Sequence, residues 1–323
     1  MNVLVWYENR PLPEAVQAEA RIYPRGIHGA LADLFDAQDD MCVRTAVMQD
    51  PQQGFSDENL AWADVLVYFG HKHWREVADD RVDLIQRRVL EGMGLILLHS
   101  SHASKIFSRL MGTRTQCLRW RENDEWQRVW LVMPAHPIAA GLNSEYFTIA
   151  QDETYGEYFE IPQPDEQVFL TTSQGGEVLR SGCCWYRGQG RIFYFSSGHE
   201  TYPVYYQPEV RQVLLNAVRW AASGPKRQAW PDWARESAPL EASRLCGPQQ
   251  QRGSKGASPS NFICISELVM RLESLRTEIR VLFRQGPEKT AIGGRSRPIR
   301  VCGAALSPFS TPDQNIKASA IKP

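Results

Sequence analysis

The sequence lacks the features that mark membrane, secreted or nucleic-acid-binding chains. No run of apolar residues approaches the roughly 18 that a membrane-spanning helix needs, so we expect no membrane partner. The first residues, 1–7, enter an apolar run directly, without the basic region and long apolar core of a signal peptide. The formal net charge of −1 gives no overall case for binding nucleic acid.

Cysteine is scarce and scattered. The seven cysteines stand at positions 42, 117, 183, 184, 246, 264 and 302. Their number is odd and no CxxC pair occurs, which predicts reduced thiols in a cytoplasmic protein. Cys183 and Cys184 are adjacent, cannot easily bridge each other and lack zinc spacing, so we interpret them as structural.

The 323 residues are enough for one large α/β domain or two smaller ones, and their composition changes along the chain. Residues 244–323 carry 13 Lys and Arg against 5 Asp and Glu, whereas residues 1–243 carry 23 against 32, and all ten Trp precede residue 234. We predict an α/β domain over 1–222 and a basic tail of low order over 223–323, in which only 263–283 has helical periodicity. The alternative for this tail is contact with an acidic surface.

Strand and helix patterns alternate through the predicted domain. The expected strands are 3–7, 43–47, 65–69, 95–98 and 191–195, and the expected helices are 29–35, 79–90, 103–110 and 208–222. Continuously apolar strands alternating with helices predict a mostly parallel sheet with helices on both faces. Between 115 and 185 only short pieces such as 129–132 and 168–172 are strand-like, which indicates an antiparallel or irregular insertion, or a sheet edge.

Histidine is rare, yet most histidines follow a predicted strand. The six are His28, His71, His73, His99, His102 and His199, and only His136 has no such placement. Because the carboxyl ends of parallel strands share one edge, these six side chains are expected in one crevice. Imidazole and carboxylate suit a divalent transition metal of the zinc type, although no HExxH motif is present. Our candidate ligands are His28, His71, His102 and His199, with Glu153 and Glu157 as carboxylate candidates; the alternative is that each histidine caps a turn or lies in the core.

The same turns allow a different chemistry. Ser100 or Ser101, between a strand and a helix, is a candidate nucleophile with His199 as base and Glu200 orienting it. The turn lacks the glycines of a GxSxG elbow, so small serines there are also explained by close approach of a substrate. Glu153 is a candidate acid, base or ligand, or part of a surface loop.

Aromatic and imidazole rings near these turns suit contacts with a sugar, and packing in the core is the competing explanation. The candidates for substrate binding are Tyr23, His99, Tyr155 and Tyr202, and Trp74 and Tyr205 lie near the same turns.

Several segments together resemble the ThuA-like family, the trehalose-utilisation proteins. They are Tyr23–His28, Phe69–His71, Arg88–His102, Pro134–Pro137, Glu153–Glu157 and Gly198–Pro203. The resemblance covers about residues 1–222 and implies a class I glutamine amidotransferase-like, flavodoxin-like fold and a role in the metabolism of sugars or keto-sugars. By fold analogy Ser100 stands where amidotransferases carry a nucleophilic cysteine, and His199 stands near their histidine. The departure to serine argues against glutamine hydrolysis.

The leading hypothesis is therefore a cytoplasmic, metal-assisted enzyme that acts on a small carbohydrate, with zinc as the first candidate metal. Its candidate catalytic residues are Ser100, Glu153, His199 and Glu200. A sugar-binding or regulatory module without catalysis, and a hydrolase with a serine nucleophile, are the alternatives. The oligomeric state is left open, a homo-oligomer included.

Overall fold

The computed structural model describes residues 1–223 except 11, 12, 14 and 117. The predicted tail beyond Ser223, with its helical pattern at 263–283, lies outside the described residues. Nine strands form one sheet in the order β2-β1-β3-β4-β9-β8-β7-β5-β6. The strands are β1 (Asn2–Tyr7), β2 (Cys42–Val47), β3 (Val65–Phe69), β4 (Gly94–Leu98), β5 (Arg119–Leu131), β6 (Tyr146–Gly156), β7 (Glu166–Ser173), β8 (Val178–Arg187) and β9 (Gly190–Phe195). The helices are α1 (Val16–Ile22), α2 (Gly26–Asp36), α3 (Asp57–Trp62), α4 (Asp79–Leu90), α5 (Lys105–Met111) and α6 (Pro208–Ala222).

The first half of the sheet is parallel. Strands β2, β1, β3, β4 and β9 pair in parallel, which is the 2-1-3-4-5 order of flavodoxin-like folds. β3 and β4 are buried along their whole length, as their apolar sequences predict. The predicted α/β, flavodoxin-like class is confirmed, and the strands predicted from the sequence are present within one residue at each end.

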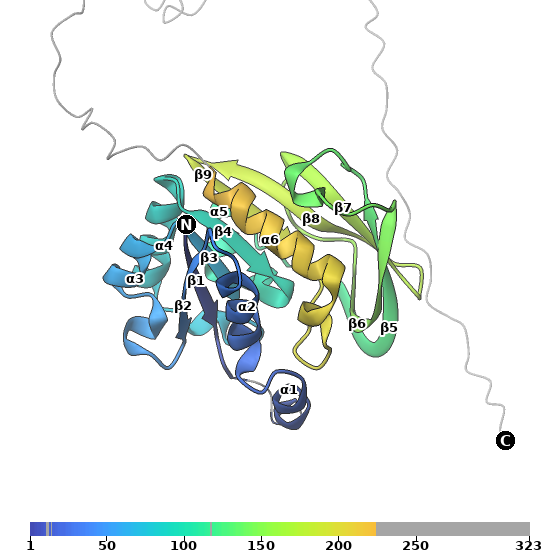
Figure 1. Ribbon diagram of the computed structural model, residues 1–323, viewed down its shortest axis with the longest axis horizontal. Coiled ribbons are helices and arrows are strands. Elements are labelled where there is room, and N and C mark those ends of the chain that lie inside the picture. Colours follow the sequence, from blue (N-terminus) through green and yellow to red (C-terminus); the bar gives the residue numbers. More distant parts are fainter. Residues whose placement is uncertain (11–12, 14, 117, 224–323) are drawn as a thin grey trace, which may run out of the picture. The chain divides into compact units, whose positions relative to one another are not determined.

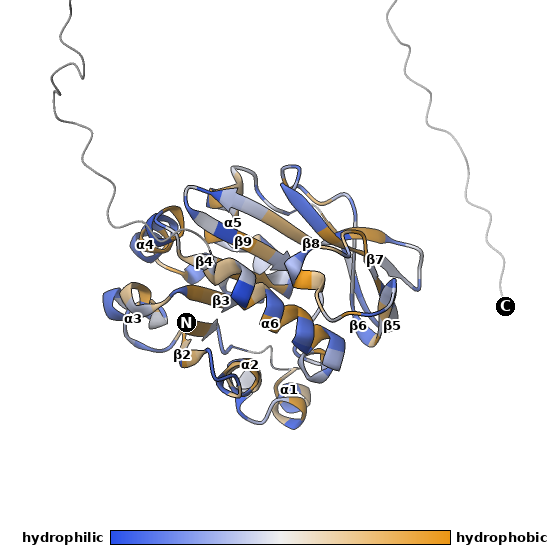
Figure 2. Ribbon diagram, turned by 45° about the horizontal axis from the view of Figure 1, so that its top comes forward, coloured by the Kyte–Doolittle hydropathy of each residue, from blue (hydrophilic) through white to orange (hydrophobic). Residues whose placement is uncertain are grey.

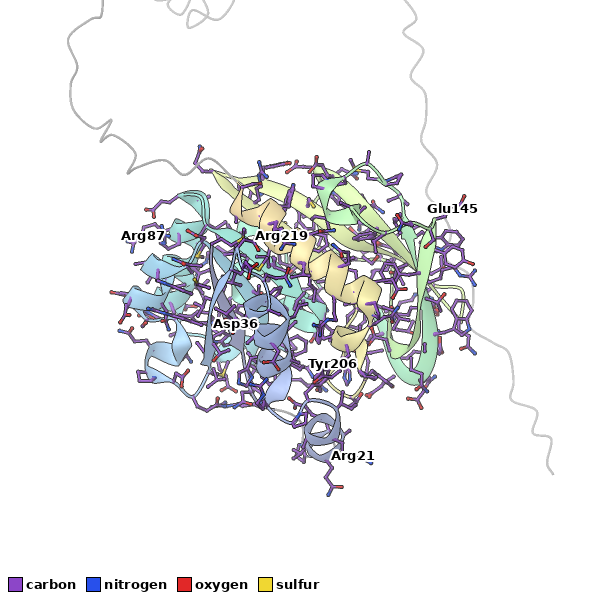
Figure 3. The ribbon with its side chains drawn as sticks, in the orientation of Figure 1. Arg21, Asp36, Arg87, Glu145, Tyr206 and Arg219 are labelled. Atoms are coloured by element: carbon purple, nitrogen blue, oxygen red, sulfur yellow. The ribbon has the colours of Figure 1, made fainter. Side chains whose placement is uncertain are left out.

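Helices cover both faces of this parallel half (Figure 1). Side chains alternate along each strand, so Val3 and Val5 join the core under α2 and α6, whereas Leu4 and Trp6 join the core under α3, α4 and α5. Figure 2 shows α6 turning hydrophobic residues toward the sheet and hydrophilic residues outward. The surface is charged: Arg21, Arg87 and Glu145 lie on the outside in Figure 3.

The second half of the sheet is antiparallel. β8, β7, β5 and β6 continue from β9 by antiparallel pairing. The insertion or edge predicted for 115–185 is therefore an extension of the same sheet, with far longer strands than the pieces at 129–132 and 168–172. The β5–β6 pairing is interrupted twice by register shifts, after Arg121 and at Glu125. Such irregularities bend a hairpin, and the residues of β6 beyond them reach the carboxyl ends of the parallel strands.

The helices with long periodic segments were predicted correctly. α4 and α6 have the predicted bounds, and Val82, Ile85 and Val89 form the buried stripe of α4. Asp79 and Asp80 lie in the first turn of α4, where acidic side chains favour the helix dipole. The short α1 was not predicted, and α2 begins before the predicted residue 29. None of the helices in the described part of the chain is both long and apolar enough to cross a bilayer.

Candidate functional site

The carboxyl ends of β3, β4 and β9 bring together three of the six histidines that were expected in one crevice. The rings of His71 and His199 have their centroids 4.9 Å apart, and those of His99 and His199 are 5.3 Å apart. β6 adds two buried carboxylates, Asp152 and Glu153. Asp152 accepts hydrogen bonds from the backbone N–H groups of Gly198 (2.9 Å) and His199 (3.0 Å), so it fixes the loop after β9.

One group at this edge has the composition of a metal site. His71, Glu153 and His199 are buried, and each offers a ligand atom within 4.8 Å of the others'. Two histidines and a carboxylate are a common set for zinc or for non-haem iron, with positions left open for water or substrate. Among the predicted ligands, His71 and His199 thus belong to one group, which Glu153 completes.

The partner of His71 fixes the position of its proton, whereas His199 Nδ1 has partners of both kinds. His71 Nδ1 faces Glu200 Oε1, which only accepts hydrogen bonds, so Nδ1 carries the proton and Nε2 keeps its lone pair. His199 Nδ1 lies 2.7 Å from Thr201 Oγ1, whose hydroxyl donates to Glu122 Oε1 at 3.2 Å. The backbone N–H of Thr201 donates to the same nitrogen at 3.3 Å, which requires its lone pair, so these contacts are compatible with the proton of His199 on either nitrogen.

This group therefore contains more buried hydrogen-bond acceptors than protons to satisfy them. Glu153 Oε2 and Glu200 Oε2 are buried and receive no hydrogen bond within the described residues, and Glu200 Oε2 lies 3.6 Å from His199 Nε2. Burial lowers the pKa of His199 to about 4, so its ring is neutral at pH 7. Burial raises the pKa of Glu200, but its bond to His71 outweighs this and leaves the pKa at about 2. A cation bound among these atoms would offset their mutual repulsion, so the residues fit a divalent metal.

His99 has a different task from the one predicted. It follows β4 directly with a positive φ of 50°, is fully buried and does not line the pocket described below. Its Nδ1 donates to the carbonyl of Ser196 (2.9 Å), and Nε2 lies 3.0 Å from Glu153 Oε2, without the alignment of a hydrogen bond. Burial lowers the pKa of His99, yet Glu153, Asp152 and the Ser196 carbonyl raise it to about 9. His99 therefore faces Glu153 instead of the pocket lining, where contact with a substrate was predicted.

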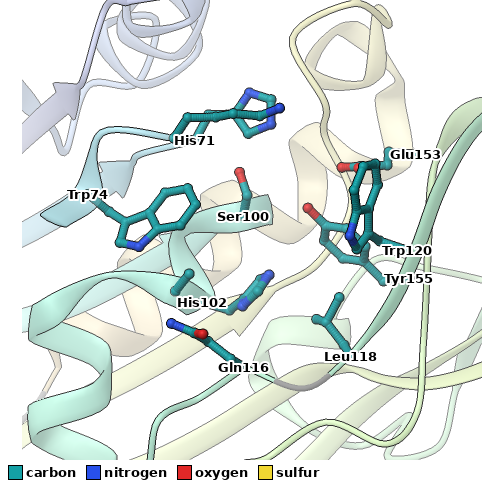
Figure 4. A pocket seen from close by; sticks show the side chains of 11 residues that line it. His71, Trp74, Ser100, His102, Gln116, Leu118, Trp120, Glu153 and Tyr155 are labelled. Atoms are coloured by element: carbon teal, nitrogen blue, oxygen red, sulfur yellow. The ribbon is translucent and has the colours of Figure 1, made fainter.

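A pocket of about 310 Å³ opens beside this group (Figure 4). Its lining includes Ser100, His102, Glu153 and Tyr155 from the predicted set, together with His71. The remaining lining residues are Lys72, Trp74, Ala103, Gln116, Leu118 and Trp120. Its size is at the lower end of the range for small-molecule sites, about 300–1,000 Å³.

His102 faces the pocket but does not join the ligand group. Its Nδ1 donates to the carbonyl of Thr115 (3.0 Å), and the ring packs edge-on against Tyr155. Burial lowers the pKa of His102 to about 4. The neutral ring therefore keeps a lone pair on Nε2, which suits accepting a hydrogen bond from a substrate hydroxyl. The ligand role of His102 stays a prediction, since its nitrogens are not among the ligand atoms that lie within 4.8 Å of one another.

Ser100 lines the pocket without the partners of a nucleophile. Its hydroxyl donates to the carbonyl of Gly70 (3.2 Å), and among the described residues no histidine hydrogen-bonds it. Ser101 accepts from the N–H of Gly70 (2.8 Å) and donates to the carbonyl of Tyr68 (3.1 Å). Both serines thus tie the turn after β4 to the end of β3, and the predicted arrangement of serine, His199 and Glu200 is not assembled.

Four other candidates belong neither to the ligand group nor to the pocket lining. His28 is half-buried and packs against Tyr7, with ring centroids 5.7 Å apart. Tyr23 is buried in the core and donates to the carbonyl of Tyr202 (2.6 Å). Tyr202 lies beside His199 but uses its hydroxyl to bind Asp124 (2.8 Å). Glu157 is paired with Arg180 Nε at 2.9 Å. Each of these side chains already has a structural partner or a core position.

Sequence reasoning missed three residues that build this site. Glu8 follows β1 and accepts from the backbone N–H groups of Lys72 (2.8 Å) and His73 (3.0 Å), so it holds the turn that carries His71. The rule used for histidines, a polar residue directly after a strand, would have found it. Thr201 and Trp120 carry no comparable signal in the sequence. The role of Thr201 depends on which nitrogen of His199 carries the proton, and the position of Trp120 depends on the bend of the β5–β6 hairpin.

A second histidine group has the opposite proton arrangement. His136, Glu166 and Cys184 also offer ligand atoms within 4.8 Å of one another. However, His136 Nδ1 accepts from the N–H of Ile138 (3.1 Å), so the proton is on Nε2 and is directed to Glu166 Oε2 (3.2 Å). Burial keeps the pKa of Cys184 well above its usual value, so the thiol is protonated. We therefore interpret this group as a structural hydrogen bond from His136 to Glu166.

Comparisons with known proteins agree with this fold. Residues 2–221 match the family model ThuA, described as trehalose utilisation. A search of curated proteins found no match. A putative ThuA-like protein from Parabacteroides merdae is similar in structure with a TM-score of 0.52 and 16% identity, covering 72% of this chain and 93% of that one. It supports the assignment of the fold.

Two further solved structures align more weakly. A putative ThuA-like protein from Bacteroides uniformis has a TM-score of 0.48 and 15% identity, over 68% of this chain and 91% of that one. A glutamine amidotransferase from Thermotoga maritima has a TM-score of 0.42 and 12% identity, over 69% and 98%.

Proposed function

Because the chain belongs to the ThuA family of trehalose-utilisation proteins, we propose that it is a metal-assisted enzyme that acts on a sugar or keto-sugar. The observation that carries the proposal is the convergence of His71, Glu153 and His199 beside a pocket of small-molecule size. Zinc is the first candidate metal, and the substrate is a small carbohydrate.

The three ligand residues are supported by a second layer of contacts. Glu200 orients His71, the pair of Thr201 and Glu122 orients His199, and His99 lies beside Glu153. Carboxylates that bind the second nitrogen of a histidine raise its basicity and fix its ring in metal sites. A bound divalent metal would polarise a substrate oxygen or acidify a water molecule.

The remaining polar groups of the pocket suit the hydroxyls of a sugar. His102 offers an acceptor on Nε2, and the amide of Gln116 offers both donors and acceptors. Ser100 and Tyr155 also line the pocket, although the Tyr155 hydroxyl is hydrogen-bonded to His99 Nε2 at 3.2 Å. Hydroxyl-rich ligands need several such groups, because each polar atom removed from water must find a new partner.

The test is metal binding by the purified full-length chain, measured by isothermal titration calorimetry with Zn²⁺ and Mn²⁺ after chelation. We expect one strong site, which His199→Ala and His71→Ala abolish. Glu200→Gln should weaken it by about 10- to 100-fold, because the ligands remain and only the support of His71 changes. His136→Ala is the matched control and should retain the wild-type affinity.

Turnover is then measured by NMR on the metal-loaded protein with trehalose and keto-sugars, before and after chelation. Activity that survives complete removal of metal would contradict the proposal. So would a metal site that His136→Ala destroys and His199→Ala spares. Sugar binding without any turnover would favour the non-catalytic binding module instead.

We also propose a cytoplasmic location with no nucleic-acid or membrane partner, as the composition predicts. A homo-oligomer is compatible with this proposal. Cell fractionation tests the location, and light scattering of the purified chain measures the oligomeric state.

A further inference from the structure

Two tryptophans form opposite walls of the candidate pocket. Trp74 follows β3 in a short 3₁₀ turn, Trp74–Glu76, and Trp120 lies near the start of β5. In Figure 4 the two indoles lie on opposite sides of the cavity, with Ser100 and His102 between them, and Tyr155 lies on the Trp120 side. The walls come from distant sequence positions and from the two different halves of the sheet.

Trp120 is exposed to an unusual degree for its size. Its side chain is 64% accessible, whereas most large apolar residues of the described chain are buried. Trp126 and Trp130 lie on the same strand but have the guanidinium of Arg128 over their rings, at 5.3 and 5.6 Å from the ring centroids. No ring or guanidinium within the described residues packs on Trp120 in this way. An unstacked indole at the mouth of a pocket leaves a large apolar face for a ligand to cover.

Trp74 adds an unmet donor. Its Nε1 is buried and has no hydrogen-bond acceptor among the described residues. A buried N–H without an acceptor is costly, and natural structures rarely leave one unmatched. A ligand oxygen beside Trp74 would provide the acceptor.

The chemistry of the floor and walls selects one class of ligand. The walls are flat and apolar, and the floor presents His71, Ser100, His102 and Gln116. A pyranose ring has C–H groups on its faces and hydroxyls around its edge, so it matches both surfaces at once. We propose that a pyranose ring binds between Trp74 and Trp120, with its hydroxyls directed to the polar floor. This inference rests on the proposed function for the choice of a sugar, but the stacking contact itself does not require a metal.

The experiment compares sugar affinity and metal affinity in the same full-length variants. Trehalose and methyl α-D-glucopyranoside are titrated into zinc-loaded protein by calorimetry, with sorbitol as an acyclic polyol that has no ring face. Both pyranosides should bind and sorbitol should not. Trp120→Ala and Trp74→Ala should each weaken pyranoside binding by about tenfold, which corresponds to the loss of one aromatic contact.

The conservative and control variants separate stacking from folding. Trp120→Phe keeps a flat ring and should stay within about threefold of the wild type, since it loses only part of the stacking area. Trp126→Ala, on the same strand and outside the pocket, should bind pyranosides like the wild type. All four variants should bind zinc with unchanged affinity.

We call the binding of a pyranose ring between Trp74 and Trp120 the clamp. A failure of the clamp and a failure of the metal proposal give different results in these experiments. Pyranoside affinity that is unchanged in Trp120→Ala, or equal for sorbitol and trehalose, overturns the clamp while zinc binding persists. Absence of pyranoside binding by the wild-type protein also overturns it. A protein that binds no zinc but loses pyranoside affinity in Trp120→Ala supports the clamp and refutes the metal-assisted function.

Discussion

The position of one proton on the imidazole separates His71 from His136. His71 donates through Nδ1 to a carboxylate, which leaves Nε2 free for a metal. His136 accepts at Nδ1 from a backbone N–H, which commits Nε2 to donate. Both groups have a ligand-like composition and similar spacing, so the difference is set by hydrogen-bond partners. At the scale of residues, the partner of the second nitrogen decides what a histidine can do.

A buried carboxyl on α1 should make stability depend on pH. Glu19 accepts from the hydroxyl of Tyr7 (2.8 Å), while its Oε2 is buried without a partner in the described part of the chain. Burial raises its pKa from 4.5 to about 7; Tyr7 and His71 oppose this shift, and Glu200 and Glu8 add to it. Between pH 4.5 and 7 the folded state keeps a proton that the unfolded chain releases, so the free energy of unfolding falls as pH rises.

We therefore expect Glu19→Gln to be more stable than the wild type at pH 8, by up to about 3 kcal/mol, and nearly equal at pH 4.5. The amide introduced by this substitution stays neutral, and its oxygen can still accept from Tyr7. Urea unfolding at both pH values measures the difference. Glu145→Gln, at an exposed position, should follow the wild type at both. An equal gain from Glu19→Gln at both pH values would show that the charge of Glu19 is not responsible.

At the scale of elements, the site depends on β6, which brings two carboxylates to the histidines. Asp152 and Glu153 lie inside this strand and are buried, although carboxylates are unfavourable in strands. Asp152 accepts backbone N–H groups of the loop after β9, and Glu153 lies beside His99. The strand thus carries two residues that its propensity disfavours because they hold the histidine loops in place.

The contact of α6 with β4 predicts a change in stability that spares the site. A Cβ added at Gly94 would lie 2.7 Å from Ala221 Cβ and 2.9 Å from the Ala221 backbone, so helix and strand would have to separate. We expect Gly94→Ala to lower the free energy of unfolding by about 1–3 kcal/mol. Zinc affinity should not change, because Gly94 is at the amino end of β4, opposite the histidines. A loss below about 0.5 kcal/mol in urea titrations would refute this packing.

At the scale of the whole molecule, the parallel half was predictable and the antiparallel half was not. Strands such as β3 and β4 are continuous apolar runs, and the polar residues after them mark one edge, which is why His71 and His199 were placed correctly. β5 mixes charged and aromatic residues without a period of two, and β6 contains buried acids, so neither has a simple strand pattern. The sequence therefore suggested a surface loop as an alternative for Glu153, and Trp120 was not recognised.

His28 and Tyr23 show the limit of the rule that polar residues after a strand lie at the carboxyl edge of the sheet. Both follow the connection after β1, which contains α1; His28 packs against Tyr7 at the end of β1, but neither residue belongs to the ligand group or lines the pocket. Tyr23 then completes the core beside Tyr205, whose backbone N–H it accepts at 3.3 Å. A rule based on order along the chain holds for residues within a few positions of a strand and fails after an intervening helix.

All nine strands of the sheet and the helices on both its faces lie within residues 1–223. A chain that ends at Ser223 should therefore unfold in one cooperative transition, as single domains do, and bind zinc like the full-length protein. Circular dichroism during urea unfolding measures this. A chain that ends at Gln207 lacks α6, which covers β4 and β9, and should not fold because the apolar face beneath that helix would be exposed to water. Loss of the cooperative transition in the 1–223 chain would show that residues 224–323 belong to the core, contrary to their composition.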